Sequence, residues 1–264
     1  MLGTATKLTG VWLAIALAAA CVAAPAAAQV DPGKLTAAEA AATRFIALAK
    51  GSETSAAPPR QSNPEVMRLL DAVFDLRDVE AAKTIAAADL APLGQRMMAG
   101  IKVGLVYLLA GTGATDFAQL GISQAAADKL NQNVVKFDPE VGRMYDFQMR
   151  VQAAVIDAAL ARIATATPAE QAQPNFQGGL QQMRAGTAQS VRGVVETLSV
   201  NGLTEEWRRA RLPVLALIAP KLSRFLLPEQ KAELQKRVLE LAGTMGDAQV
   251  KRGLQDFAKV VAGG

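Results

Sequence analysis

Two glutamines interrupt the apolar face of the clearest helix that the sequence predicts. That helix covers residues 138–165, and on a helical wheel Gln148 and Gln152 lie one turn apart in the middle of the apolar face. Burying an amide is unfavourable unless it is hydrogen-bonded, so both side chains need partners inside the protein. Two hypotheses follow. Either the amides bond to another helix and fix its register, or they point into a ligand cavity that is also lined by Met144, Tyr145 and Met149.

A run of basic residues in the C-terminal third is a second candidate, with the chemistry of an anion site. It consists of Arg208, Arg209, Arg211, Lys221 and Arg224. Such a patch could hold an anion, a phospholipid headgroup or an acidic partner. On a straight helix Arg208 and Arg211 fall among apolar residues, and Pro213 is expected to end or kink the helix after them. Solvated surface is the favoured interpretation, because Glu205 and Glu206 lie close enough to neutralise part of the charge.

Carboxylates are a third candidate, because the chain contains no histidine and its single cysteine lies near the N-terminus. After signal cleavage this composition excludes the usual zinc sites, Ser-His-Asp and Cys-His nucleophiles, and haem with a histidine ligand. A carboxylate-dependent cell-wall hydrolase would need a glutamate in an apolar pocket. Most of the glutamates considered instead have contexts typical of helix-dipole or i,i+4 partners. These are Glu205, Glu206, Glu229, Glu233 and Glu240.

Residues 1–28 have the pattern of a cleavable secretory signal peptide. Lys7 supplies a positive start, a short apolar stretch follows, and Ala26 and Ala28 form an A-x-A cleavage site. Cleavage after Ala28 would release a periplasmic or secreted protein. The alternative is a lipid anchor at Cys21, which follows three alanines but lacks the aliphatic residue expected three positions earlier. Both interpretations place the protein in the cell envelope.

Removal of these 28 residues would leave 236 of the 264, enough for one domain with a sizeable core. The net charge would fall from +4 to +3 with the loss of Lys7, a balance that does not argue for nucleic-acid binding. The mature chain would have no disulfide, so its stability must come from packing. We expect no transmembrane helix after cleavage.

Periodicity and capping residues predict an all-α protein, a single-domain antiparallel bundle or array of about nine helices. Residues 36–39 have capping-box spacing and are expected to begin the first helix, and Asn63 is expected to cap the next. Residues 29–62 are assigned to an N-terminal helix and a Pro/Ser-rich linker, and residues 63–264 to the helical domain. The predicted helix at 91–110 ends in a segment that is apolar nearly all round and is interpreted as a central core helix.

The expected function is that of a non-enzymatic structural or binding module of the envelope, whose partner is a protein or a lipid. One alternative is a carrier that holds an apolar ligand in a helical cavity near Gln148 and Gln152. The other is the cell-wall hydrolase described above. No cofactor or metal is expected.

Overall fold

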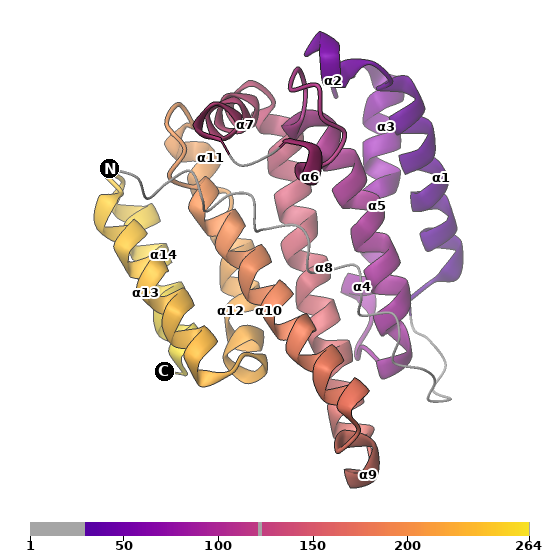
Figure 1. Cartoon of the computed structure of the whole chain (residues 1–264), viewed down its shortest axis with the longest axis vertical. Helices are drawn as coiled ribbons and strands as arrows, with labels where there is room; N and C mark the ends of the chain where they lie inside the picture. The colour runs from indigo at the N-terminus through magenta and orange to yellow at the C-terminus, as the bar shows by residue number, and fades with distance from the viewer. Residues whose placement is uncertain (1–29, 121–122, 264) are drawn as a thin grey trace.

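All regular structure is helical in the part of the chain that the structure describes, residues 30–120 and 123–263 of a computed structural model (Figure 1). No strand occurs in those ranges, so the prediction of an all-α protein is confirmed. The signal peptide predicted at 1–28, with Cys21, lies outside the described residues. Nine described helices have ten residues or more: α1 (Pro32–Leu48), α3 (Pro64–Val73), α5 (Leu90–Leu108), α7 (Gln124–Lys136), α8 (Asp138–Thr165), α10 (Pro174–Thr197), α12 (Leu212–Phe225), α13 (Pro228–Thr244) and α14 (Ala248–Ala262).

Short helices connect the long ones. They are α2 (Ser52–Ser55), α4 (Arg77–Ala81), α6 (Phe117–Leu120), α9 (Pro168–Gln171) and α11 (Glu205–Arg209), with a 3-10 turn η3 at Ala87–Asp89. None of the described helices is both long and apolar enough to cross a membrane.

Helices begin where a polar side chain can accept the free backbone N–H groups of the first turn. Asn63 and Ser123 cap α3 and α7 in this way, as their positions in the sequence predict. The expected start of the first helix at 36–39 is wrong. α1 begins earlier, at Pro32, because the Asp31 carboxylate accepts the N–H of Gly33 at 2.8 Å. Thr36 lies inside the helix, where its hydroxyl donates to a backbone carbonyl one turn earlier.

The long helix α8 occupies the centre of the molecule (Figure 1). It packs against α5 on one side and α12 on the other. Beyond α5 come α1 and α3, and beyond α12 come α14 and α13. One large hydrophobic cluster extends from α1 to α14, and a smaller one fills the space between α4, α5 and α8.

Two glycines allow α5 to approach α8 closely. A Cβ atom added to Gly100 would lie 2.2 Å from a ring carbon of Phe147, and one added to Gly104 would lie 1.8 Å from Sδ of Met144. Both distances are far below van der Waals contact, so larger residues would push the helices apart. This contact fixes one face of α5 against α8.

Candidate functional site

The two glutamines of α8 hydrogen-bond to hydroxyl groups of α10. Gln148 Nε2 donates to Ser190 Oγ at 2.8 Å, and Gln152 Nε2 donates to Thr187 Oγ1 at 2.9 Å. All four side chains are buried, and we call them the polar seam. The Oε1 atoms of both glutamines are buried without a hydrogen-bond partner among the described residues. The polar seam therefore joins α8 to α10 with half of each amide left unsatisfied.

The other residues of the predicted ligand cavity are packed in the large hydrophobic cluster of the core. Met144 packs against Gly104 of α5, and Met149 is fully buried in the core. The hydroxyl of Tyr145 accepts a hydrogen bond from Thr197 Oγ1 at 3.2 Å, and burial raises the pKa of this tyrosine to about 12. None of these three residues, and neither glutamine, lines the cleft between α7 and α10 or the groove between α1 and α5.

Four of the five residues of the predicted basic patch form ion pairs, each with a different carboxylate. Arg224 forms none with the described residues. Because α11 ends at Arg209 and α12 begins at Leu212, the expected break near Pro213 is confirmed. The charge is spread over α11, α12 and the turn between them, and four of the five basic groups are paired. The pairs are Arg208–Glu205 (2.5 Å), Arg209–Asp247, Arg211–Asp146 (3.1 Å) and Lys221–Asp157.

Arg211 is buried where α11 meets the first turns of α8. Its guanidinium lies 4.5 Å from the ring centroid of Trp207, within cation–π range. A Cβ on Gly142 would lie 2.3 Å from Arg211 Nη2, so only glycine leaves room for it. Arg211 Nη2 also donates to Asp146 Oδ2 at 3.1 Å, and Trp207 Nε1 donates to the carbonyl of Asp138 at 2.9 Å. These contacts fix α11 on α8 and use the arginine as a structural group.

Asp146 is the described carboxyl group whose pKa is raised. Burial raises it, and the nearby Arg211 and Arg150 oppose the shift. A cell-wall hydrolase requires an acid of this kind in a cleft that admits substrate. Asp146 does not line the cleft between α7 and α10 or the groove between α1 and α5. Among the described residues, no group of acidic side chains could hold a metal ion.

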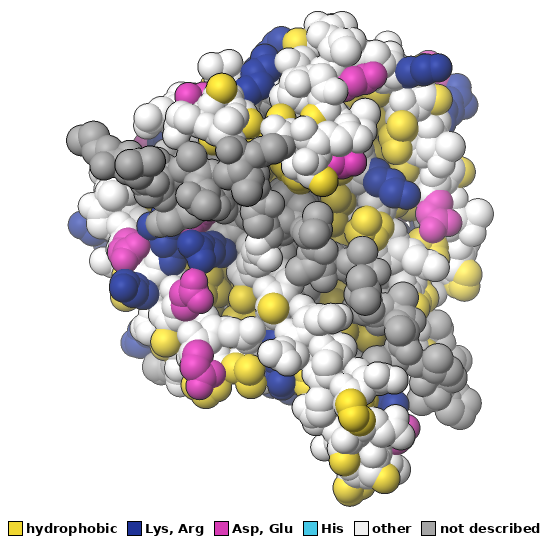
Figure 2. Space-filling model, viewed as in Figure 1, with side chains coloured by type: hydrophobic (Ala, Val, Ile, Leu, Met, Phe, Trp, Pro, Cys, Tyr) yellow, Lys and Arg dark blue, Asp and Glu magenta, His cyan; other side chains and the backbone are white. Residues whose placement is uncertain are grey.

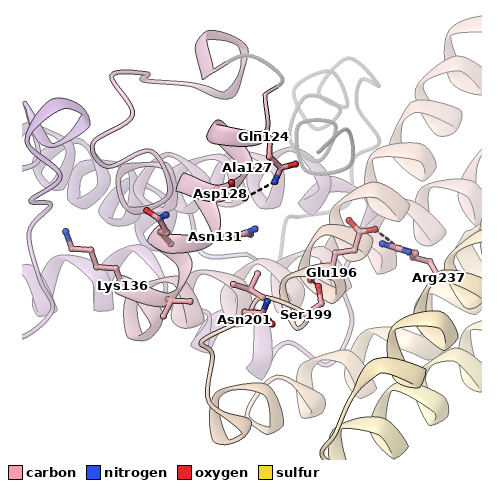
Figure 3. Close-up of a pocket in the computed structure, with 12 residues that line it drawn as sticks. Gln124, Ala127, Asp128, Asn131, Lys136, Glu196, Ser199, Asn201 and Arg237 are labelled. Carbon is pink, nitrogen blue, oxygen red and sulfur yellow. Dashed lines mark hydrogen bonds and ion pairs between the residues drawn. The ribbon is translucent and has the colours of Figure 1, made fainter. Parts of the chain in front are cut away.

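A polar cleft with a volume of about 710 Å³ opens between α7 and the C-terminal end of α10 (Figure 3). This volume is within the range typical of ligand sites. Asn131 and Gln132 lie on the α7 wall, and Ser199 and Asn201 come from the turn after α10. In Figure 3, Asn131 extends from α7 toward the space between these walls. We call this feature the polar cleft.

Neutral amides are the free hydrogen-bonding groups of the polar cleft. The side chains of Asn131, Gln132 and Asn201 have no partner among the described residues. Asp128, by contrast, accepts a hydrogen bond from Gln124 Nε2 at 2.8 Å. No aromatic side chain lines the cleft in the part of the chain that the structure describes.

Glu196, which lines the polar cleft, is held between two arginines. Its Oε1 atom lies 3.0 Å from Arg192 Nε and 2.9 Å from Arg237 Nε. The hydrogen bond to Glu196 raises the pKa of Arg237. The arginines also pair with Glu233 and Glu240, at 2.9 and 3.0 Å respectively. This charge-assisted network fixes α13 against α10.

An apolar groove with a volume of about 410 Å³ lies between the end of α1 and the outer face of α5. Ile46 lines it from α1, and Leu105 and Val106 line it from α5. Lys50 and Lys102 also line it, and both are exposed. Figure 2 shows yellow hydrophobic side chains beside dark-blue basic ones over α1 and α5. We call this feature the apolar groove.

The sequence patterns do not anticipate either cleft. The helix at 91–110 is expected to be central, and α5 does bury Val103 and Tyr107, but Leu105 and Val106 remain half-exposed on its opposite side. The end of this helix is apolar nearly all round, so it has more apolar surface than the neighbouring helices cover. That excess of apolar residues is the feature of the sequence that could have indicated the apolar groove. The signal for the polar cleft was weaker, an amide pair at Asn131 and Gln132 on a predicted helix.

Comparison of the chain with protein-family models, curated proteins and solved structures finds no match in any of the three. Function is therefore inferred from the residues of this chain alone.

Proposed function

We propose that this protein is an exported, non-enzymatic binding protein of the cell envelope, which takes an extended segment of a partner protein into the polar cleft. Export is inferred from the signal pattern of residues 1–28, with cleavage after Ala28 and a periplasmic or secreted destination. The helices form an antiparallel bundle or array that serves as a rigid frame for the cleft.

The observation that carries this proposal is the set of unpaired amides on facing walls. Asn131 and Gln132 on one wall and Asn201 on the other each offer two N–H donors and a carbonyl acceptor. An extended polypeptide presents the same groups in alternation along its backbone, so amide side chains can pair with it without a net charge. Val135 and Val200 add apolar surface for a small side chain of the partner.

The cleft is less suited to catalysis or to sugars. Both of its acids are already engaged, Asp128 by Gln124 and Glu196 by two arginines. A general acid or base needs a carboxyl group that is free to reach the substrate. Sugar rings commonly stack on aromatic side chains, and the described lining has none. A peptide backbone needs neither feature.

Site-directed photo-crosslinking in intact cells tests the proposal. A photoreactive phenylalanine analogue replaces Gln124, at the α7 wall of the cleft, or, as a control, Gln255, an exposed glutamine on α14. We expect a discrete protein adduct from position 124 and none from position 255. The adduct should be lost when Asn131→Trp fills the cleft. Absence of an adduct at position 124, or the same adduct at both positions, would refute binding in the cleft.

A further inference from the structure

The apolar groove on α5 is a second site, independent of the polar cleft. We propose that it binds one long-chain fatty acid, with the acyl chain along α5 and the carboxylate between Lys50 and Lys102. The proposal rests on the shape of the groove, on its apolar lining and on the two lysines.

The walls of the groove are set by the packing of α5 and α2. The inner face of α5 is packed against α8 through Gly100 and Gly104, which leaves Leu105 and Val106 on the outside. Beyond the end of α1, helix α2 is tied to the loop after α5, since the N–H of Gly111 donates to a carbonyl of α2 at 3.1 Å. Ser52 and Glu53 of this tied segment also line the groove.

The apolar lining favours a hydrocarbon ligand. Ile46 has 39% of its surface exposed. With Leu105 and Val106 across the groove, it forms an apolar strip between two helices. Covering this strip with an acyl chain removes apolar surface from water on both partners.

The volume of the groove matches a ligand with one acyl chain. An apolar cavity of about 150 Å³ accommodates benzene, with six carbon atoms. At the same packing, the 410 Å³ of the groove accommodates about 16 carbon-sized atoms. That is about the size of one acyl chain with its carboxylate, and a second chain of the same length would lie outside the groove.

The charged residues that line the groove favour a ligand with a carboxylate head group. Lys50 and Lys102 both line the groove, and neither forms an ion pair with any described residue. Their aliphatic stems can lie along the chain of the ligand while the ammonium groups reach the carboxylate. Glu53 also lines the groove, so its charged lining amounts to one net positive charge, which matches one carboxylate.

Calorimetric titration of the purified protein with tetradecanoate and with tetradecanol tests the proposal. The two probes have the same chain and differ in the charge of the head. We expect tetradecanoate to bind at least tenfold more tightly. The double substitution Lys50→Gln, Lys102→Gln should remove this preference and leave tetradecanol binding unchanged. Glu53→Gln should strengthen tetradecanoate binding. Lys236→Gln, at an exposed lysine of α13, is the matched control and should change neither affinity.

Two further variants locate the bound chain. Val106→Trp on α5 and Ala47→Trp on α1 fill the groove from opposite walls, and either should abolish binding of both probes in a protein that still melts cooperatively.

Equal affinity for the two probes, or loss of preference in the Lys236→Gln control, would overturn the assignment of the head group. Unchanged binding in either tryptophan variant would overturn the site. Tighter binding of a tetradecanoyl lysophospholipid than of tetradecanoate would overturn the choice of a free fatty acid. None of these outcomes bears on the polar cleft.

Discussion

Replacement of Gln148 by leucine is expected to stabilise this protein, although it removes a buried hydrogen bond. In the polar seam, Gln148 Nε2 donates to Ser190 Oγ while its Oε1 atom has no partner among the described residues. The lost hydrogen bond contributes about 1 kcal/mol net, whereas the unsatisfied oxygen costs about 1–3 kcal/mol. The difference favours Gln148→Leu by about 1 kcal/mol, and the Ser190 hydroxyl can turn to a carbonyl of its own helix.

Replacement of Ser190, the partner of Gln148, is expected to have the opposite effect on stability. Ser190→Ala leaves both ends of the buried amide without a partner and should destabilise the protein by about 1–3 kcal/mol. The double variant replaces both partners by apolar groups and should be close to neutral or more stable than the wild type. The two single changes are therefore strongly non-additive, as expected for residues in direct contact.

Urea unfolding measures these differences as shifts in midpoint at a constant slope. A change of about 1 kcal/mol corresponds to about 2–4 °C in melting temperature for a chain of this length. Gln181→Leu, at an exposed position of α10, is the control and should lie within about 0.5 kcal/mol of the wild type. A loss of more than about 1 kcal/mol in Gln148→Leu would refute the reasoning, since it would mean that Oε1 is hydrogen-bonded in the native protein.

Three further predictions concern packing, capping and pH. Gly104→Ala should destabilise the protein by about 1–3 kcal/mol, because the added Cβ has no room against α8. Gly94→Ala, in open space on the same helix, should stabilise the protein by up to about 1 kcal/mol, as measured by urea unfolding. Equal effects of the two substitutions would contradict the close approach of α5 and α8. Asn133→Ala should cost about 2 kcal/mol and speed amide exchange at the end of α5, because its amide donates to two carbonyls there at 2.8 Å; unchanged exchange would count against this cap. The hydrogen bond from Arg209 lowers the pKa of Asp247 to about 2. The stability that this carboxylate contributes is therefore complete at pH values above its ordinary pKa of 3.8, and it is lost as the pH falls toward 2. Asp247→Asn should flatten that part of the melting-temperature profile, and an unaltered profile would show that the pair contributes nothing.

Sequence patterns predict the helices of this protein well, because their starts depend on local chemistry. Asn63 and Ser123 cap the helices they are expected to cap, and Pro213 lies in the first turn of a new helix. The failure at 36–39 is informative, since two acceptable caps compete there and the earlier one, Asp31, gives a longer helix. The local sequence identifies candidate capping residues but does not show which of them begins the helix.

The candidate sites could not be derived in the same way, because they depend on contacts between distant segments. The wheel predicts that Gln148 is buried, but nothing local shows that Ser190 on α10 is its partner. The basic run looks like a patch in the sequence, yet four of its five charges are paired with carboxylates up to 65 residues away, as in Arg211–Asp146. The clefts are spaces between helices, so they have no signature in any single segment.

The stacking of Arg211 on Trp207 has a spectroscopic consequence. Cleavage after Ala28 would remove Trp12 and leave Trp207 as the lone tryptophan of the mature chain. Its indole is buried, with one face under a guanidinium and its N–H bonded to the carbonyl of Asp138. The fluorescence of the mature protein would then report on one joint, where α11 meets the start of α8. Opening of that joint would shift the emission to longer wavelength even while the rest of the helices stay folded, so the chain contains its own local probe of partial unfolding.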